Sequence, residues 1–100
     1  MNAKMKIVVQ HWGRTTEERY ATPATLIVPG FCKPIQVATD KRGSWWFVTD
    51  IKTGAYIIRG RTRKEAVALA VAQLEKAGEA AYDAAVRRWG LPTGPKNDEA

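Results

Sequence analysis

The chain has 100 residues, of which 45% are hydrophobic, four are tryptophan and one is cysteine, and its formal net charge is +6. This length and composition predict one globular domain with a modest core, and they exclude a disordered polypeptide. No apolar run is long enough to span a bilayer, and no secretory signal peptide is recognisable. The lone cysteine, Cys32, cannot form an internal disulfide. We therefore expect a cytoplasmic protein that has no membrane partner.

The positive charge is concentrated in one part of the chain. Residues 41–64 hold seven basic side chains and one acidic side chain, whereas the remaining residues hold nine of each. Such a distribution is typical of a surface that faces phosphates or an acidic partner. A solvated basic face that only aids solubility is the alternative interpretation.

The first part of the chain predicts three strands. Residues 6–12 are rich in β-branched side chains, residues 24–28 stop at a Pro–Gly turn signal, and residues 35–40 alternate apolar with polar side chains. The polar segment 14–23 is expected to form a loop between the first two strands.

A tight turn and a fourth strand follow. In the tetrapeptide 40–43, Asp40 is expected to accept hydrogen bonds from the turn backbone and Gly43 to take a positive φ. Residues 44–50 form the fourth strand, in which Trp45 and Trp46 point to opposite faces. One tryptophan therefore lies under another element or is exposed for use.

A turn at residues 52–54 leads to a fifth strand at 55–59. Thr62 and Glu65 then form a capping box, which starts a helix that runs to about Ala77. Gly78 closes this helix, and residues 79–89 form a second helix.

These elements predict an α+β fold for residues 1–91. An antiparallel sheet of four to five strands is followed by two C-terminal helices packed on one face, and residues 92–100 form a flexible tail.

The sequence contains few side chains that could serve in catalysis. His11 has no marked partner, Cys32 lacks the surroundings of a reactive thiol, and Glu17 and Glu18 are adjacent in the expected loop. A metal site needs three or four convergent ligands, and no phosphate-binding glycine loop is present. We expect neither an enzyme nor a cofactor.

Binding has more support than catalysis. Three basic residues stand at or just before a helix N-terminus, where the helix dipole disfavours cations and a bound anion would relieve the conflict. Other cations lie in the hairpin among aromatic rings, and such rings can stack on unpaired bases. A two-stranded ribbon also fits the DNA major groove. The candidate residues for binding nucleic acid or an acidic partner are Lys41, Arg42, Trp46, Lys52, Tyr56, Arg59, Arg61, Arg63 and Lys64.

The pattern G-x-W-x-x-x-x-D-x-x-T-G, followed by a strand and T-x-x-E-A, resembles the three-stranded-sheet-plus-helix domain at the N-termini of phage tyrosine recombinases. The resemblance covers about a third of the chain, and in that family the sheet enters the DNA major groove. It implies a DNA-binding role, although double-stranded-RNA-binding domains and some antitoxin domains share the strand–strand–helix order. The residues that carry it are Gly43, Trp45, Asp50, Thr53, Gly54, Thr62, Glu65 and Ala66.

Two functions of different classes remain open. The first is a non-enzymatic nucleic-acid-binding module, with DNA favoured over RNA, as in an accessory protein of a phage or mobile element. The second is a small protein-binding inhibitor or adaptor, such as an anti-CRISPR-like antagonist that meets a host nucleic-acid-processing protein. Self-association through an edge strand or through the helix at residues 79–89 is open in either case.

Overall fold

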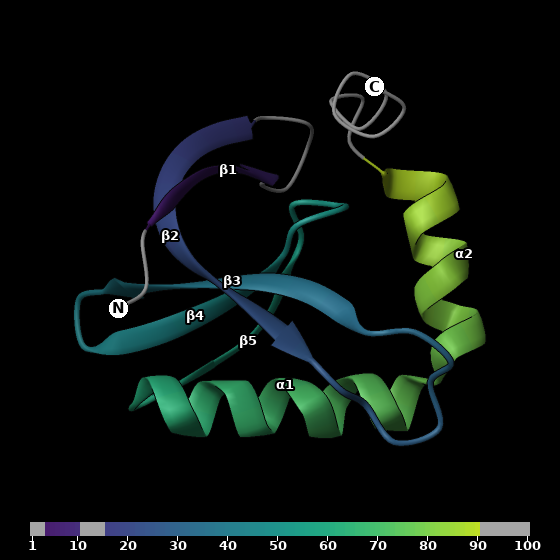
Figure 1. The fold of residues 1–100 in the computed structure, drawn as a ribbon. Helices are drawn as coiled ribbons and strands as arrows, with labels where there is room; N and C mark the ends of the chain where they lie inside the picture. Colours follow the sequence, from purple (N-terminus) through teal and green to yellow (C-terminus); the bar gives the residue numbers. More distant parts are fainter. Residues whose placement is uncertain (1–3, 11–15, 91–100) are drawn as a thin grey trace.

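The computed structural model describes residues 4–10 and 16–90, which fold as an antiparallel sheet followed by two helices (Figure 1). The helices are α1 (Arg63–Ala77) and α2 (Glu79–Trp89). The predicted α+β class, with two C-terminal helices on an antiparallel sheet, is confirmed. The strands neighbour one another in chain order and are β1 (Met5–Gln10), β2 (Thr16–Leu26), β3 (Ile35–Arg42), β4 (Trp45–Asp50) and β5 (Tyr56–Gly60).

The prediction of a loop between the first two strands was wrong. The polar segment belongs to β2, whose first part pairs with β1 from Thr16 to Ala21 and whose second part pairs with β3 from Thr22 to Leu26. Each half of β2 is held in the sheet by backbone pairing with one neighbouring strand. Pro23 is tolerated because only its β3 side is paired there, so its missing N–H removes no second ladder bond.

Other strand boundaries differ by one or two residues from those expected. β1 is described from Met5 to Gln10, and His11 and Trp12 of the expected strand lie outside the described residues. β2 ends at Leu26 rather than at Val28.

The turn between β3 and β4 is tighter than the sequence predicted. β3 continues to Arg42, so the turn consists of Gly43 and Ser44, and Gly43 has a φ of 63°. Asp40 lies within the strand and binds side chains rather than the turn backbone. The β3–β4 hairpin is therefore longer than expected and carries Lys41 and Arg42 close to its tip.

Helix α1 begins where the capping box predicted. Thr62 Oγ1 accepts from the Glu65 backbone N–H at 3.0 Å, and the Glu65 carboxylate accepts from the Arg61 N–H at 2.8 Å. The helix starts very close to the end of β5, since a Cβ built on Gly60 would lie 2.7 Å from the Ala66 nitrogen. Glycine at position 60 allows this approach and places the start of α1 beside the end of β5.

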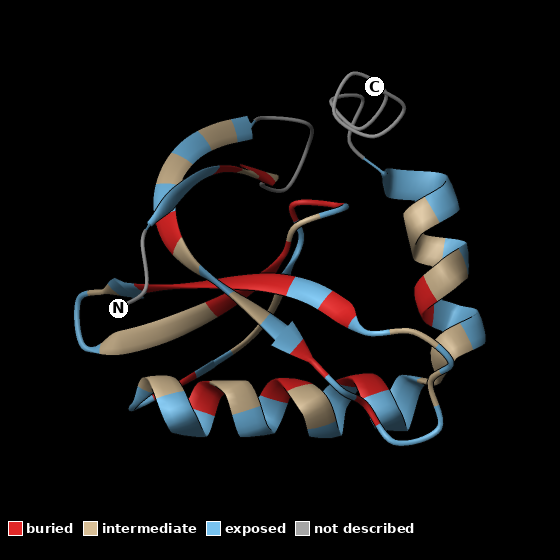
Figure 2. Cartoon of the chain, viewed as in Figure 1, coloured by how far each residue is buried: buried red, intermediate tan, exposed pale blue. Residues whose placement is uncertain are grey.

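One face of the sheet is covered by α1 and forms the larger core. Val37 of β3 and Val48 of β4 pack against Ala66, Ala70 and Leu74 of the helix. Figure 2 shows buried residues running along β3 and recurring along α1.

The opposite face is covered at one end by the β1–β2 arm, which consists of residues 5–10 and 16–21. Ile7, Val9 and Ala21 of this arm pack on Ala38 of β3 with Ile51 beside them. The Gln10 N–H donates to the Gly54 carbonyl at 2.8 Å, which fastens the arm to the β4–β5 turn. The arm therefore closes over the end of the sheet that lies far from the β3–β4 hairpin tip (Figure 1).

Helix α2 is attached to the sheet through one buried residue. The Tyr82 hydroxyl donates to Asp50 Oδ1 at 2.8 Å, and Tyr82 is 8% exposed. Lys33 adds an outer contact through ion pairs with Glu79 and Asp83. Within the described residues, neither helix is long and apolar enough to cross a membrane.

Candidate functional site

The part of the sheet that the β1–β2 arm leaves uncovered carries alternating arginine and aromatic side chains. They lie on the face opposite α1, because Val48 and Trp46 of β4 pack toward the helix and the odd-numbered residues of β4 point the other way. We call this surface the arginine–aromatic face. It consists of Arg42, Trp45, Phe47, Tyr56, Arg59 and Arg61.

Trp45 is the residue around which two cations gather. The Arg59 guanidinium carbon lies 4.6 Å from its ring centroid, and that of Arg61 lies 5.1 Å away. Both arginines are exposed, and neither forms an ion pair with an acidic residue in the described part of the chain. Two like charges beside one ring repel each other, and a bound anion would relieve that repulsion.

Phe47 continues the same face toward the middle of the sheet. The Arg42 guanidinium lies 4.4 Å from the Phe47 centroid, and the Tyr56 ring is tilted against Phe47 at 5.5 Å. Tyr56 is 51% exposed although its strand neighbour Thr49 is buried. The aromatic row therefore ends in a ring that is open to solvent.

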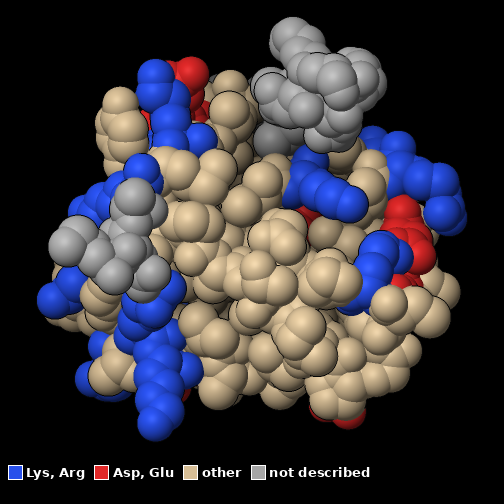
Figure 3. Space-filling view, in the orientation of Figure 1, with Lys and Arg blue, Asp and Glu red and all other residues tan. Residues whose placement is uncertain are grey.

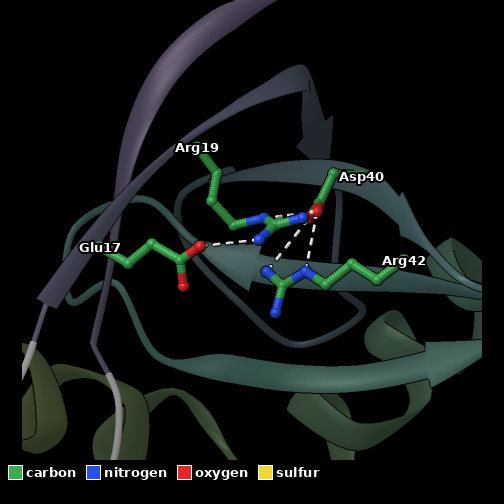
Figure 4. Close-up of polar contacts among 4 residues, drawn as sticks. All are labelled: Glu17, Arg19, Asp40 and Arg42. Carbon is green, nitrogen blue, oxygen red and sulfur yellow. Dashed lines mark hydrogen bonds and ion pairs between the residues drawn. The ribbon is translucent and has the colours of Figure 1, made fainter.

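A network of four charges separates this face from the β1–β2 arm (Figure 4). Asp40 is buried and accepts from Arg19 Nε at 3.0 Å and from Arg42 Nε at 2.8 Å, and Arg19 also pairs with Glu17 at 2.8 Å. Burial lowers the pKa of Arg19, but the hydrogen bonds and charges of Glu17 and Asp40 outweigh this and raise the pKa overall. The two arginines of this network are thus balanced by two carboxylates.

The free positive charge lies instead at the end of the sheet where the β3–β4 hairpin tip meets the start of α1. Lys41, Arg59, Arg61 and Lys64 are exposed there, and none has an acidic ion-pair partner among the residues described. Figure 3 shows lysine and arginine side chains on the left side of the molecule, where Figure 1 places these elements. The middle of the face in Figure 3 is mostly uncharged.

The remaining candidate residues take other positions. Lys52 lies in the β4–β5 turn, at the far end of β4, about 20 Å from the hairpin tip for a strand of six residues. Arg63 is half-buried and donates from Nε to Thr39 Oγ1 at 2.8 Å, on the helix side of the sheet. The structure therefore brings six of the seven predicted cations to one end of the sheet and leaves Lys52 apart.

The two central tryptophans lie on opposite faces, as the strand alternation predicted. Trp46 is half-buried and packs against the core beneath α1, so Trp45 is the tryptophan that meets the arginines. The binding residues predicted from the sequence do not include Trp45, Phe47, Arg19 or Asp40. Their convergence follows from the observed register, in which Arg42 is the cross-strand partner of Trp45 and Arg59 that of Phe47.

The residues considered for catalysis do not converge. Cys32 is exposed, Glu17 bonds to Arg19, and His11 lies outside the described residues. Among the residues that the structure describes, no three His, Cys, Asp or Glu side chains come close enough to hold a metal ion.

The shared sequence pattern at residues 50–54 has a structural explanation. Asp50 Oδ2 accepts from both the backbone N–H and the hydroxyl of Thr53, and Gly54 takes a φ of 73° while donating to the Asp50 carbonyl. These residues build the β4–β5 turn. Comparison with protein-family models, curated proteins and solved structures finds no significant match to this chain.

Proposed function

We propose that the protein is a non-enzymatic nucleic-acid-binding module that holds phosphates at the end of the arginine–aromatic face. Arg59 and Arg61 are the principal contacts, and Lys41 and Lys64 widen the positive surface around them. Phosphate contacts of this kind supply affinity without reading sequence.

The observation that carries the proposal is the placement of Arg59 and Arg61 at Trp45. Their guanidinium groups lie within 5.1 Å of one ring and have no acidic partner in the described chain. A cation held on an aromatic surface loses little side-chain freedom when it binds an anion, because the ring already restricts it. Arg42, by contrast, is committed to Asp40 through two hydrogen bonds.

The experiment compares three proteins for binding to labelled duplex DNA, duplex RNA and single strands at low and physiological salt. They are the wild type, the double variant Arg59→Ala/Arg61→Ala, and the control Arg87→Ala/Arg88→Ala. The control removes the same charge from exposed positions in the last turn of α2, on a different element. We expect salt-sensitive binding that falls about tenfold or more in the first variant, a loss of about 1.4 kcal/mol or more, and by much less in the control.

Two outcomes would contradict this account. Equal losses in both double variants would mean that overall charge, rather than the arginine–aromatic face, governs binding. Absence of binding at low salt would remove the nucleic-acid function, since a surface this basic binds phosphate polymers if they are its partners. The protein-binding inhibitor or adaptor would then become the leading hypothesis.

A further inference from the structure

The arginine–aromatic face carries aromatic rings as well as cations. A nucleic-acid duplex offers no free base face on which such a ring could stack. Phosphates of either strand form can be neutralised by Arg59 and Arg61 alone. In a duplex the base faces are stacked on one another inside the helix, whereas an unpaired base offers its face to a protein ring. Trp45 and Phe47 are half-buried with arginines over their rings, whereas Tyr56 is 51% exposed and is suited to a ligand with unpaired bases.

The spacing of the rings follows the strand geometry. Trp45 and Phe47 are two residues apart on one face of β4, which places them about 7 Å apart along the strand. Tyr56 lies on the neighbouring strand β5, 5.5 Å from the Phe47 ring, and is the most exposed of the three. The cations stand at one end of this row and the open tyrosine ring at the other.

The β1–β2 arm limits what can lie on this face. The arm packs on Ala38 and Ile51 as a second layer, and packed layers of sheet stand about 10 Å apart. Figure 1 shows β1 and the first half of β2 rising beside β3 and β4. This arm forms a wall along one border of the arginine–aromatic face, and its Arg19 side chain bonds to Asp40 of β3 and to Glu17.

We propose that the ligand of the arginine–aromatic face is a single-stranded nucleic acid, with its phosphates at Arg59 and Arg61 and an unpaired base stacked on Tyr56. This inference rests on the proposed function and specifies the form of nucleic acid. The face lies between the wall and the edge strand β5, and the positive charge of Arg59 and Arg61 is complementary to a phosphate backbone. A base and a phosphate of the same strand thus meet the protein within one continuous row of side chains.

The test uses Tyr56 because this ring is exposed and can be replaced without opening the core. Tyr56→Leu removes the ring, Tyr56→Phe keeps the ring and removes the hydroxyl, and Tyr20→Leu removes a ring that is 64% exposed on β2, outside the arginine–aromatic face. Each protein is titrated with single-stranded DNA and RNA oligonucleotides of about 20 nucleotides and with the matching duplexes, a length that exceeds one binding site. Thermal unfolding of each variant checks that the fold is retained.

We expect single strands to bind at least tenfold more tightly than the duplexes at the same salt concentration. Tyr56→Leu is expected to lose about tenfold in single-strand affinity, while Tyr56→Phe and Tyr20→Leu stay within about twofold of the wild type. Comparing the DNA and RNA oligonucleotides shows which backbone is preferred.

The opposite results separate this inference from the proposed function. Duplex binding as tight as single-strand binding, unchanged in Tyr56→Leu, would overturn the single-strand inference and leave the nucleic-acid function in place. A Tyr56→Phe loss equal to that of Tyr56→Leu would overturn stacking. No salt-sensitive binding to any of the probes would overturn both proposals.

Discussion

The Tyr82 hydroxyl donates a 2.8 Å hydrogen bond to Oδ1 of Asp50, which joins the last helix to the end of β4. Asp50 is 3% exposed, and its other oxygen is held by Thr53. The carboxylate therefore connects the β4–β5 turn, the sheet and α2. Because the turn is also fastened to Gln10 of β1, this contact supports the wall beside the arginine–aromatic face.

Removing the Tyr82 hydroxyl should destabilise the fold measurably. Tyr82→Phe leaves a buried carboxylate oxygen without its donor, and we expect the free energy of unfolding to fall by about 2 kcal/mol. Tyr56→Phe is the matched control, since that hydroxyl is exposed and makes no hydrogen bond within the described chain. Urea denaturation of the three proteins measures the difference, and equal stabilities would contradict a structural role for the bond.

The same residue predicts how stability depends on alkaline pH. Burial, and next the charge of Asp50, raise the pKa of Tyr82 well above the ordinary tyrosine value of about 10. Above about pH 10 the unfolded chain releases this proton while the folded chain keeps it, so the unfolded state binds fewer protons and the free energy of unfolding falls as pH rises.

Tyr82→Phe removes this contribution. The stability difference between the wild type and the variant should be constant up to about pH 9 and should narrow above about pH 10. Denaturation at a series of pH values measures it. A difference that stays constant to about pH 11 would show that Tyr82 ionises in the folded protein as it does in the unfolded chain.

Asp40 should contribute more to the free energy of unfolding than the carboxylate of an exposed ion pair does. Asp40→Asn removes the charged partner of Arg42 and one of the two charged partners of Arg19 in a partly buried site, and we expect a loss of about 2 kcal/mol in unfolding free energy. Glu18→Gln breaks the exposed pair with Lys6 and should cost less than about 0.5 kcal/mol. Similar effects of the two substitutions in denaturant titrations would argue against the network in Figure 4 as a stabilising element.

Replacing either of two buried threonines with valine should change the stability of the protein, and the two changes should have opposite signs. Thr49 Oγ1 is buried without a hydrogen-bond partner in the described structure, so Thr49→Val should stabilise the protein by about 1 kcal/mol. Thr39 Oγ1 accepts from Arg63 and donates to the Thr22 carbonyl, so Thr39→Val should destabilise it by about 1–2 kcal/mol. Thermal melting curves of both variants measure these changes. A lower melting temperature for Thr49→Val than for the wild type would mean that the Thr49 hydroxyl forms a hydrogen bond in the folded protein.

The helices were predictable because their signals are local. Thr62, Glu65 and Gly78 mark the ends of α1 within a few residues of the backbone groups they satisfy, and no distant contact changes that chemistry. The hairpin could be predicted for the same reason, although its tip lies beyond Asp40, whose carboxylate binds Arg19 of β2 and Arg42 of β3 instead of the turn backbone.

The long strand β2 was not predictable from its composition. Its inward positions Glu17 and Arg19 are polar, so the apolar alternation that marks a half-buried strand is missing. These side chains are nevertheless accommodated because Arg19 reaches Asp40, about twenty residues later in the chain. Tertiary pairing, rather than local preference, makes this segment a strand.

The choice between Trp45 and Trp46 also depends on distant elements. Each face of β4 begins with a tryptophan, so alternation shows that the two rings diverge but leaves open which of them α1 covers. The close approach of α1 at Gly60, the strand neighbour of Trp46, determines the covered face. Trp45 is thereby left with Arg59 and Arg61.

The most direct test of the central claim is the salt dependence of single-strand binding in the wild type and in Arg59→Ala/Arg61→Ala. Each phosphate neutralised on a single strand contributes about 0.7 to the slope of log affinity against log salt concentration. We predict that the variant loses about 1.4 from the wild-type slope, because two phosphate contacts are removed. An unchanged slope would contradict the assignment of Arg59 and Arg61 as phosphate contacts.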